Sequence, residues 1–166
     1  MSPTYHAVIA NLGFALLVGA ATGLVVRGRA SFCWTFVVYL LSTASFQSLI
    51  IWWPERFFVF TFYFVKELVL VLLKIGVAFE IWQRCFSSFP QARVRTGFLL
   101  TSALAVMALA SQLVPDGLYP YDLLMGVILP RLQSGVLLLY ALLVCATAWY
   151  RVPMHPTHRA ILLGFA

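Results

Sequence analysis

The hydrophobic and polar positions of this chain alternate in long blocks. Polar segments with turn-forming residues separate the blocks, for example Pro-Asp-Gly at residues 115–117. A membrane-spanning helix needs about 20 apolar residues, whereas strands of a membrane β-barrel alternate over about 10. The pattern therefore predicts an all-α protein, a polytopic transmembrane helical bundle with five spans. The spans are expected at residues of about 5–26, 31–53, 57–82, 96–114 and 121–150.

Two prolines mark departures from simple spans. Pro130 lies inside the fifth apolar stretch, where its missing N–H predicts a kink. After Pro156, the apolar fragment of residues 160–166 is too short to cross a membrane. It could form an interfacial turn or the beginning of a truncated sixth span, and the sequence leaves both open. Since the polar segments are short, residues 1–166 are predicted to form a single transmembrane domain.

The composition agrees with a membrane protein. Hydrophobic residues make up 63% of the chain, charged residues make up 10%, and the mean hydropathy is +0.96. An average soluble domain contains about 25% charged residues. A net charge of +6 would suggest nucleic-acid binding in a soluble protein. Here the basic residues cluster at predicted span ends, so we expect membrane lipids and no nucleic acid as partners.

The arginines predict the orientation of the spans. Short loops rich in Lys and Arg remain on the cytoplasmic side of a membrane. With the N-terminus outside, Arg56 is the only arginine of the outer segments. We therefore expect a multi-pass protein with its N-terminus outside and the end of the fifth span in the cytoplasm. The arginines that then face inward are Arg27, Arg29, Arg84, Arg93, Arg95, Arg151 and Arg159.

The third apolar stretch carries charged residues. On a helix that advances 100° per residue, one sector about 140° wide holds all four: Lys66, Glu67, Lys74 and Glu80. A charge in the middle of a membrane is costly, so this sector should face the bundle interior or a wet cavity. Glu80 falls near the inner edge of the span, where it could pair with Arg84, four residues further along.

Depth suggests a partner for Glu67. At 1.5 Å per residue, Glu67 lies about 4 to 5 Å and Arg131 about 7 to 8 Å on the outer side of the membrane centre. We therefore predict a buried Glu67–Arg131 ion pair that fixes how two helices dock. Gln133 and Ser134 would satisfy the remaining hydrogen bonds. In an alternative interpretation, Glu67 or Lys74 belongs to a path for protons or a substrate.

Residues suited to catalysis or cofactor ligation form no recognisable arrangement. The histidines lie at the edges of the predicted spans, so no histidine within a span could ligate haem or chlorophyll. His155 and His158 lack a visible third metal ligand, and the cysteines show no CxxC spacing. The patterns of serine hydrolases, zinc proteases and P-loop proteins are also absent. We therefore expect a protein that is not an enzyme, and its cofactors are unknown.

Aromatic and small residues could contact neighbouring proteins. Residues 57–64 include five phenylalanines, which either pack against the core and lipid or face a quinone or pigment carried by a neighbour. Gly19 and Gly23 form a small-xxx-small pair that favours close helix contact. We therefore expect other membrane protein subunits as partners, and these subunits could carry a pigment or a quinone.

The run KELVLVLLKIGVAFEIWQRCFSSFPQARVR, residues 66–95, resembles a segment in a group of uncharacterised multi-span membrane proteins of Acidobacteria-like bacteria. Residues 131–140 and 158–166 are also similar to segments of that group, which continues into a further span after the second segment. The resemblance implies a helical bundle in a bacterial inner membrane and implies no activity. The matching positions are Glu67, Glu80, Ile81, Trp82, Phe89, Pro90 and Arg93.

Two hypotheses for the function follow. The first is a non-enzymatic integral membrane subunit, an accessory or scaffolding component of a larger membrane complex. The alternative is a small transporter or proton-conducting module that uses Glu67, Lys74 and Arg131. The substitution Glu67→Gln should distinguish them, because it would abolish flux in a transporter but release or destabilise a scaffold.

Overall fold

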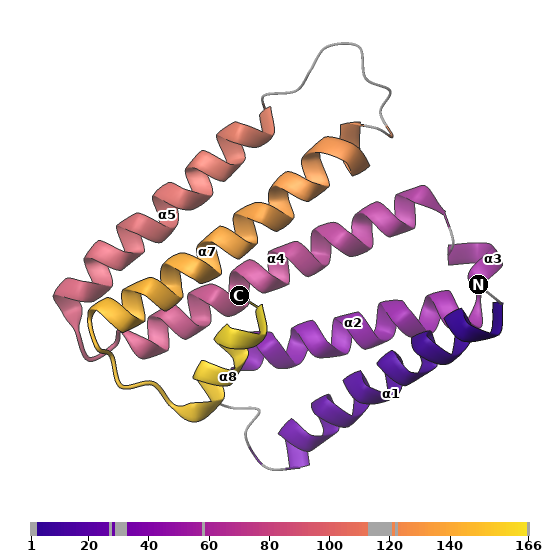
Figure 1. Ribbon diagram of the computed structural model, residues 1–166, viewed down its shortest axis with the longest axis horizontal. Helices are drawn as coiled ribbons and strands as arrows, with labels where there is room; N and C mark the ends of the chain where they lie inside the picture. The colour runs from indigo at the N-terminus through magenta and orange to yellow at the C-terminus, as the bar shows by residue number, and fades with distance from the viewer. Residues whose placement is uncertain are drawn as a thin grey trace. The chain divides into compact units, whose positions relative to one another are not determined.

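The computed structural model describes residues 3–26, 28, 33–57, 59–112, 121 and 123–165. The elements within these residues are helical (Figure 1). They are α1 (Pro3–Val26), α2 (Trp34–Trp52), α3 (Pro54–Phe57), α4 (Phe60–Cys85), α5 (Pro90–Gln112), the π-helix η2 (Leu123–Ile128), α7 (Leu129–Trp149) and α8 (Pro156–Phe165). The turn expected at residues 115–117, and Arg27 and Arg29, lie outside the described residues.

Three helices of the described chain are long and apolar enough to cross a membrane, which indicates a membrane protein. They are Trp34–Trp52, Pro90–Ala110 and Leu123–Trp149, the last of which combines η2 and α7. The expectation of five spans is therefore corrected to three by length and composition. The C-terminal helix α8 has 10 residues, about 15 Å at 1.5 Å per residue, which is too short to span.

Two of the five predicted spans, the first and the third, are not among these three helices, and the reason differs between them. The stretch expected at 57–82 does form a long helix, the 26-residue α4, but charged residues recur throughout its length. Charges at this density make a helix costly to surround with hydrocarbon. In the first stretch, α1 has 24 residues, and Asn11–Val26 is the segment of it that counts as an apolar helix, which is shorter than a typical span of about 20 residues.

One helix begins earlier than the apolar pattern predicts. The segment before residue 96 was expected to be a polar link, yet α5 begins at Pro90. A proline is well suited to the first turn of a helix, because its fixed φ is helical and its missing N–H would have no partner there. The polar residues that follow Pro90 then extend the helix out of the apolar stretch.

The chain divides into two compact units, Met1–Leu73 and Lys74–Ala166, with their boundary inside α4. In the N-terminal unit, α1 packs beside α2 (Figure 1). Gly19 and Gly23 lie on the exposed side of α1, and a Cβ atom on either glycine would meet nothing within 4 Å among the described residues. The predicted small-xxx-small pair therefore does not form the contact between α1 and α2.

Part of the phenylalanine-rich segment packs inside the N-terminal unit. The ring of Phe62 in α4 lies 5.8 Å from Phe46 of α2 and 4.9 Å from Phe57 of α3, measured between ring centroids. Phe60 and Phe64 stack along the same helix with centroids 6.4 Å apart. These distances are typical of aromatic pairs, so the rings join α2, α3 and the first part of α4.

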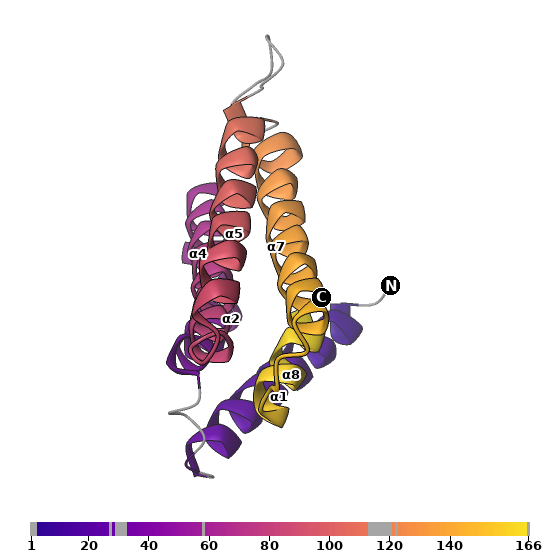
Figure 2. The ribbon, with the colours of Figure 1, turned by 90° about the vertical axis from the view of Figure 1, so that its left-hand side faces the viewer.

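In the C-terminal unit, α5 and α7 run side by side, as the views of Figures 1 and 2 both show. The hydroxyl of Tyr140 in α7 donates a 2.9 Å hydrogen bond to the carbonyl oxygen of Lys74, and its ring stacks on Phe165 of α8 at 5.0 Å. Tyr140 thus ties three helices together. The largest fully buried side chains of this unit are Tyr140, Phe86, Ile81, Leu100, Leu139, Leu143, Leu162 and Val77.

Trp82 fixes the connection between α4 and α5. Its Nε1 donates a 2.9 Å hydrogen bond to Oγ1 of Thr96, which in turn donates to the carbonyl oxygen of Ala92 at 2.7 Å. Gly97 leaves space for the indole, since a Cβ atom there would lie 2.7 Å from Cζ2 of Trp82. The guanidinium carbon of Arg93 lies 5.6 Å from the centroid of the same ring, within the range of a cation–π contact.

Candidate functional site: a groove between α5 and α7

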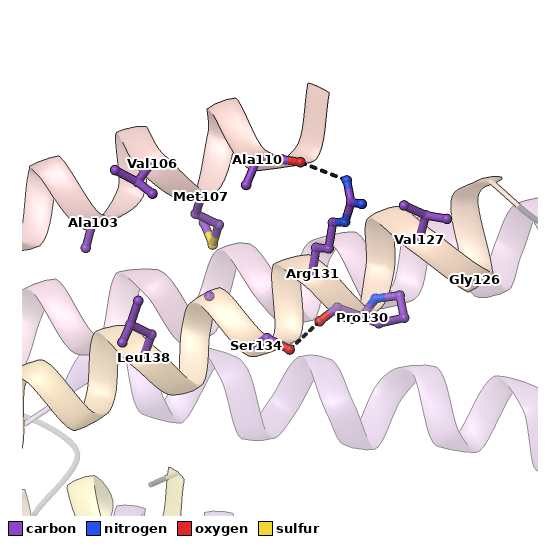
Figure 3. A pocket seen from close by; sticks show the side chains of 11 residues that line it. Ala103, Val106, Met107, Ala110, Gly126, Val127, Pro130, Arg131, Ser134 and Leu138 are labelled. Carbon is purple, nitrogen blue, oxygen red and sulfur yellow. Dashed lines mark hydrogen bonds between the residues drawn. The ribbon is translucent and has the colours of Figure 1, made fainter. Parts of the chain in front are cut away.

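A groove of about 660 Å³ lies between α5 and the continuous segment of η2 and α7 in the C-terminal unit (Figure 3). Its α5 wall consists of the small or apolar residues Ala103, Val106, Met107 and Ala110. Its other wall consists of residues from η2 and the first turns of α7. The volume falls within the range of about 300 to 1,000 Å³ that is typical of ligand-binding clefts.

The second wall has the wide backbone of a π-helix. In an α-helix, the ring of Pro130 would clash with the carbonyl of Gly126, four residues earlier. The π-helix η2 ends directly before this position, and α7 starts at Leu129 with Pro130 in its first turn. Pro130, where a kink was expected, therefore lies within two residues of the junction of a π-helix with an α-helix. Such π segments are frequent at functional sites.

Towards one end of the groove, α7 approaches α5 closely. A Cβ atom on Gly135 would collide with Sδ of Met107, so the Met107 side chain can take this position only because residue 135 has no side chain. Small residues permit such close approach between membrane helices. At the other end, a Cβ atom on Gly126 would meet nothing within 4 Å. The groove therefore has open space next to η2, and it continues past Gly135 to Ala103 and Leu138.

Among the described residues that line the groove, Arg131 is the one that carries a charge. Its Nη1 donates a 2.8 Å hydrogen bond to the carbonyl oxygen of Ala110, as Figure 3 shows. Ala110 lies in the last turn of α5, where carbonyls have no partner within the helix and carry partial negative charge. The guanidinium therefore caps the C-terminal end of α5.

Two polar residues near Arg131 face outward. Gln133 and Ser134 are both exposed, and Ser134 also lines the groove. Oγ of Ser134 donates a 2.8 Å hydrogen bond to the carbonyl oxygen of Pro130 in its own helix (Figure 3). A serine bonded to its own helix in this way can face an apolar environment at little cost.

In the N-terminal unit, Lys66 and Glu67 pair with each other. Nζ of Lys66 lies 3.1 Å from Oε1 of Glu67, and the two side chains are 11% and 19% exposed. The ammonium also lies 4.0 Å from the ring centroid of Tyr63, where a cation–π contact adds to its stabilisation. The helix therefore provides a countercharge for Glu67 from the adjacent residue.

The other charged residues of α4 belong to the C-terminal unit. Nη2 of Arg84 lies 2.7 Å from Oε1 of Glu80, and their spacing of four residues brings the two side chains to the same face of the helix. Lys74 contacts α7 through its backbone, because its carbonyl oxygen accepts the hydrogen bond from the hydroxyl of Tyr140. These contacts place Glu80 and Arg84 in a local ion pair and Lys74 next to the core.

The Glu67–Arg131 ion pair stays a prediction, since Glu67 and Arg131 belong to different units. Sequence reasoning found the charged residues but missed the carbonyl of Ala110, because a backbone acceptor has no signal in the residue type. It also missed the contact between Gly135 and Met107. The glycine of the segment RLQSGVLLLY was visible, but a single glycine does not identify its neighbour.

Histidines and cysteines assemble no metal centre in the described part of the chain. No group of three or more His, Cys, Asp or Glu side chains there could hold a metal ion. The rings of His155 and His158 form a pair with centroids 6.1 Å apart. Cys85 is a free thiol at the end of α4, and burial raises its pKa to about 11, which disfavours the reactive thiolate.

No protein-family model, curated protein or solved structure matches this chain. The resemblance of residues 66–95 to multi-span bacterial proteins therefore stays a prediction. The groove and the charges of α4 are therefore the features of this chain that bear on its function.

Proposed function

We propose that this chain is a non-enzymatic accessory subunit that docks beside a larger complex in a bacterial inner membrane. The groove between α5 and the η2–α7 segment receives a transmembrane helix of the partner, which carries an acidic side chain that meets Arg131. The observation that carries this proposal is an open groove with apolar walls and one guanidinium on its lining. The partner subunit could itself carry a pigment or a quinone.

The composition of the groove favours a protein helix over an acyl chain as its occupant. Helices associate in membranes through close packing and polar contacts rather than through hydrophobic burial, since lipid is also apolar. Ala103, Ala110 and Gly126 are small enough for another backbone to approach the groove walls. An arginine within a helix that is apolar enough to span a membrane is best stabilised by a carboxylate, which the guanidinium can bind with two hydrogen bonds.

The basic residues near helix ends support the proposed orientation, with the N-terminus outside and the end of α7 in the cytoplasm. Arg84 and Arg95 are exposed near the connection between α4 and α5, and Arg151 and Arg159 are exposed beyond the end of α7. Basic residues of this kind remain on the cytoplasmic side during insertion. With α2, α5 and the η2–α7 segment as the spans, Arg56 of α3 would lie on this same side.

Site-specific crosslinking in native membranes tests the docking. A photoreactive amino acid at Val127, which lines the groove, should crosslink to a transmembrane segment that contains Asp or Glu, as mapped by mass spectrometry. The same amino acid at Leu16, an exposed position of α1, is the control and should not crosslink to that segment. Crosslinks from residue 127 to lipid alone would contradict the proposal.

A groove-filling substitution makes this test specific. Gly126→Leu adds a side chain in open space, so it should fill the groove without disturbing the fold. It should abolish the crosslink from residue 127. Gly23→Leu, which adds the same side chain in open space on α1, should leave the crosslink unchanged. A crosslink that persists in Gly126→Leu would show that the partner does not enter the groove.

The Lys66–Glu67 pair favours a second candidate function, a small transporter or proton-conducting module that uses Glu67, Lys74 and Arg131. Charged side chains with little exposure inside a long helix are common in proton and substrate paths. Glu67→Gln in proteoliposomes should then abolish a flux while the protein still assembles. Release of the variant from a complex, without any change in flux, would favour the accessory subunit.

A further inference from the structure

A second cavity lies beyond the end of α7, away from the α5–α7 groove. It has a volume of about 460 Å³ and lies between the last turns of α7, the connection that follows, and α8. Two arginines, Arg151 and Arg159, are among the residues that line it. Its other lining residues are mostly apolar and include Val144, Met154, Leu162 and Leu163. The cavity thus combines positive charge with apolar walls.

The backbone at Arg151 has a conformation that normally requires glycine. The N–H of Val152 donates to the carbonyl of Thr147, and the N–H of Arg151 donates to the carbonyl of Ala148. These two bonds define a Schellman motif at the end of α7, in which the residue with positive φ is usually glycine. Here this residue is Arg151, with a φ of 48°.

This unusual residue requires an explanation. A side chain in the left-handed region is strained, whereas glycine adopts the same backbone at no steric cost. Strained backbone positions of this kind concentrate at functional sites. A glycine would terminate α7 equally well but would remove the guanidinium from the cavity. A function of the Arg151 side chain in this cavity would account for the exception.

The second guanidinium is held by a docked helix. Arg159 lies in the first turns of α8, where its N–H donates to the carbonyl of His155 at 3.2 Å. The buried face of α8 contains His158, Ile161 and Leu162, and Phe165 stacks on Tyr140 of α7. Because these contacts fix α8 on α7, Arg151 and Arg159 line the same cavity. Neither has a carboxylate partner among the described side chains.

We propose that this cavity binds the phosphate group of an anionic ligand between Arg151 and Arg159. Guanidinium groups bind phosphate oxygens with charge-assisted hydrogen bonds and geometric specificity. The apolar walls suit the glycerol and acyl carbons of a phospholipid, and the proposed orientation places the cavity at the cytoplasmic leaflet, which is rich in anionic lipids. A free phosphate is the other source of the same chemistry. The site does not depend on the docking groove.

Binding to the purified full chain in mild detergent tests the proposal. Short-chain phosphatidylglycerol, phosphatidylcholine and inorganic phosphate are added separately, and the shift in Tm and the bound ligand in native mass spectrometry are measured. Phosphatidylglycerol should bind more tightly than phosphatidylcholine. Each guanidinium should contribute about fivefold in affinity, so Arg151→Gly with Arg159→Gln should weaken binding about 25-fold. Saturation by inorganic phosphate with the same dependence on the arginines would identify free phosphate as the source.

The variant Arg151→Gly separates binding from folding. Because glycine suits the Schellman position better than arginine, this variant should have a Tm equal to or higher than that of the unmodified chain without ligand. It should nevertheless bind phosphatidylglycerol about fivefold more weakly. Arg56→Gln removes an exposed arginine of α3 and should change neither property. The proposal would be overturned if the unmodified chain, Arg151→Gly and the double variant all bound phosphatidylglycerol with equal affinity.

Discussion

The guanidinium of Arg131 in α7 donates a 2.8 Å hydrogen bond to the carbonyl oxygen of Ala110 in the last turn of α5. One helix thus caps the end of its neighbour. The carbonyls in this turn carry the negative end of the helix dipole, and in an apolar environment they cannot rely on water as a donor. Arg131 therefore fixes the register of α5 against α7 as well as providing the charge of the groove.

Removal of this cap should destabilise the C-terminal unit. A hydrogen bond with a charged donor contributes about 1.5 to 3 kcal/mol, so Arg131→Gln should lower the free energy of unfolding by about that amount. Arg84→Gln is a matched control, because its ion pair with Glu80 involves a 40% exposed side chain and should contribute only about 0.5 kcal/mol. Denaturant unfolding in mixed micelles measures both. Equal effects of the two substitutions would contradict the capping role of Arg131.

The contact between Gly135 and Met107 makes a second prediction. Gly135→Ala should destabilise the protein by about 0.5 to 1.5 kcal/mol, because the added methyl group overlaps the end of the Met107 side chain and forces it out of its rotamer. Met107→Ala combined with Gly135→Ala should recover part of this loss, since it removes the atoms that collide. Gly126→Ala adds the same methyl group in open space and should be neutral or slightly stabilising. Without recovery in the double variant, the two residues would not be in direct contact.

The sequence predicted the long helices and the charged sector of α4 because both depend on local patterns. It predicted neither the start of α5 at Pro90 nor the contacts of Arg131, because these depend on which residues of other helices are near. Glu67 illustrates the difference. Hydrophobic periodicity identified it as a charge that needs a partner. The structure provides Lys66 from the adjacent position, whereas the pair with Arg131 suggested by depth stays a prediction. A pattern along one helix does not specify which neighbour is within reach.

The Lys66–Glu67 pair should be more sensitive to loss of one partner than of both. Glu67→Gln leaves the ammonium of Lys66, whose side chain is only 11% exposed, without its countercharge, and should cost about 2 to 3 kcal/mol. Lys66→Met combined with Glu67→Leu removes both charges and should be less destabilising than Glu67→Gln alone. The free energies of unfolding of the two variants provide the measurement. If the double variant were the less stable of the two, the ion pair would contribute net stability, beyond offsetting the cost of burying its two charges.

Burial of Cys85 predicts how stability depends on alkaline pH. The pKa of its thiol is raised from 9.0 to about 11 in the folded chain, so between these values the unfolded chain loses a proton that the folded chain retains. The stabilisation is therefore complete below about pH 9 and declines as the pH rises towards about 11, at about 1 kcal/mol per pH unit. Cys85→Ala lacks this titration, so its free energy of unfolding should decrease less over the same interval. Parallel pH profiles for the two proteins would show that Cys85 titrates alike in the folded and unfolded chains.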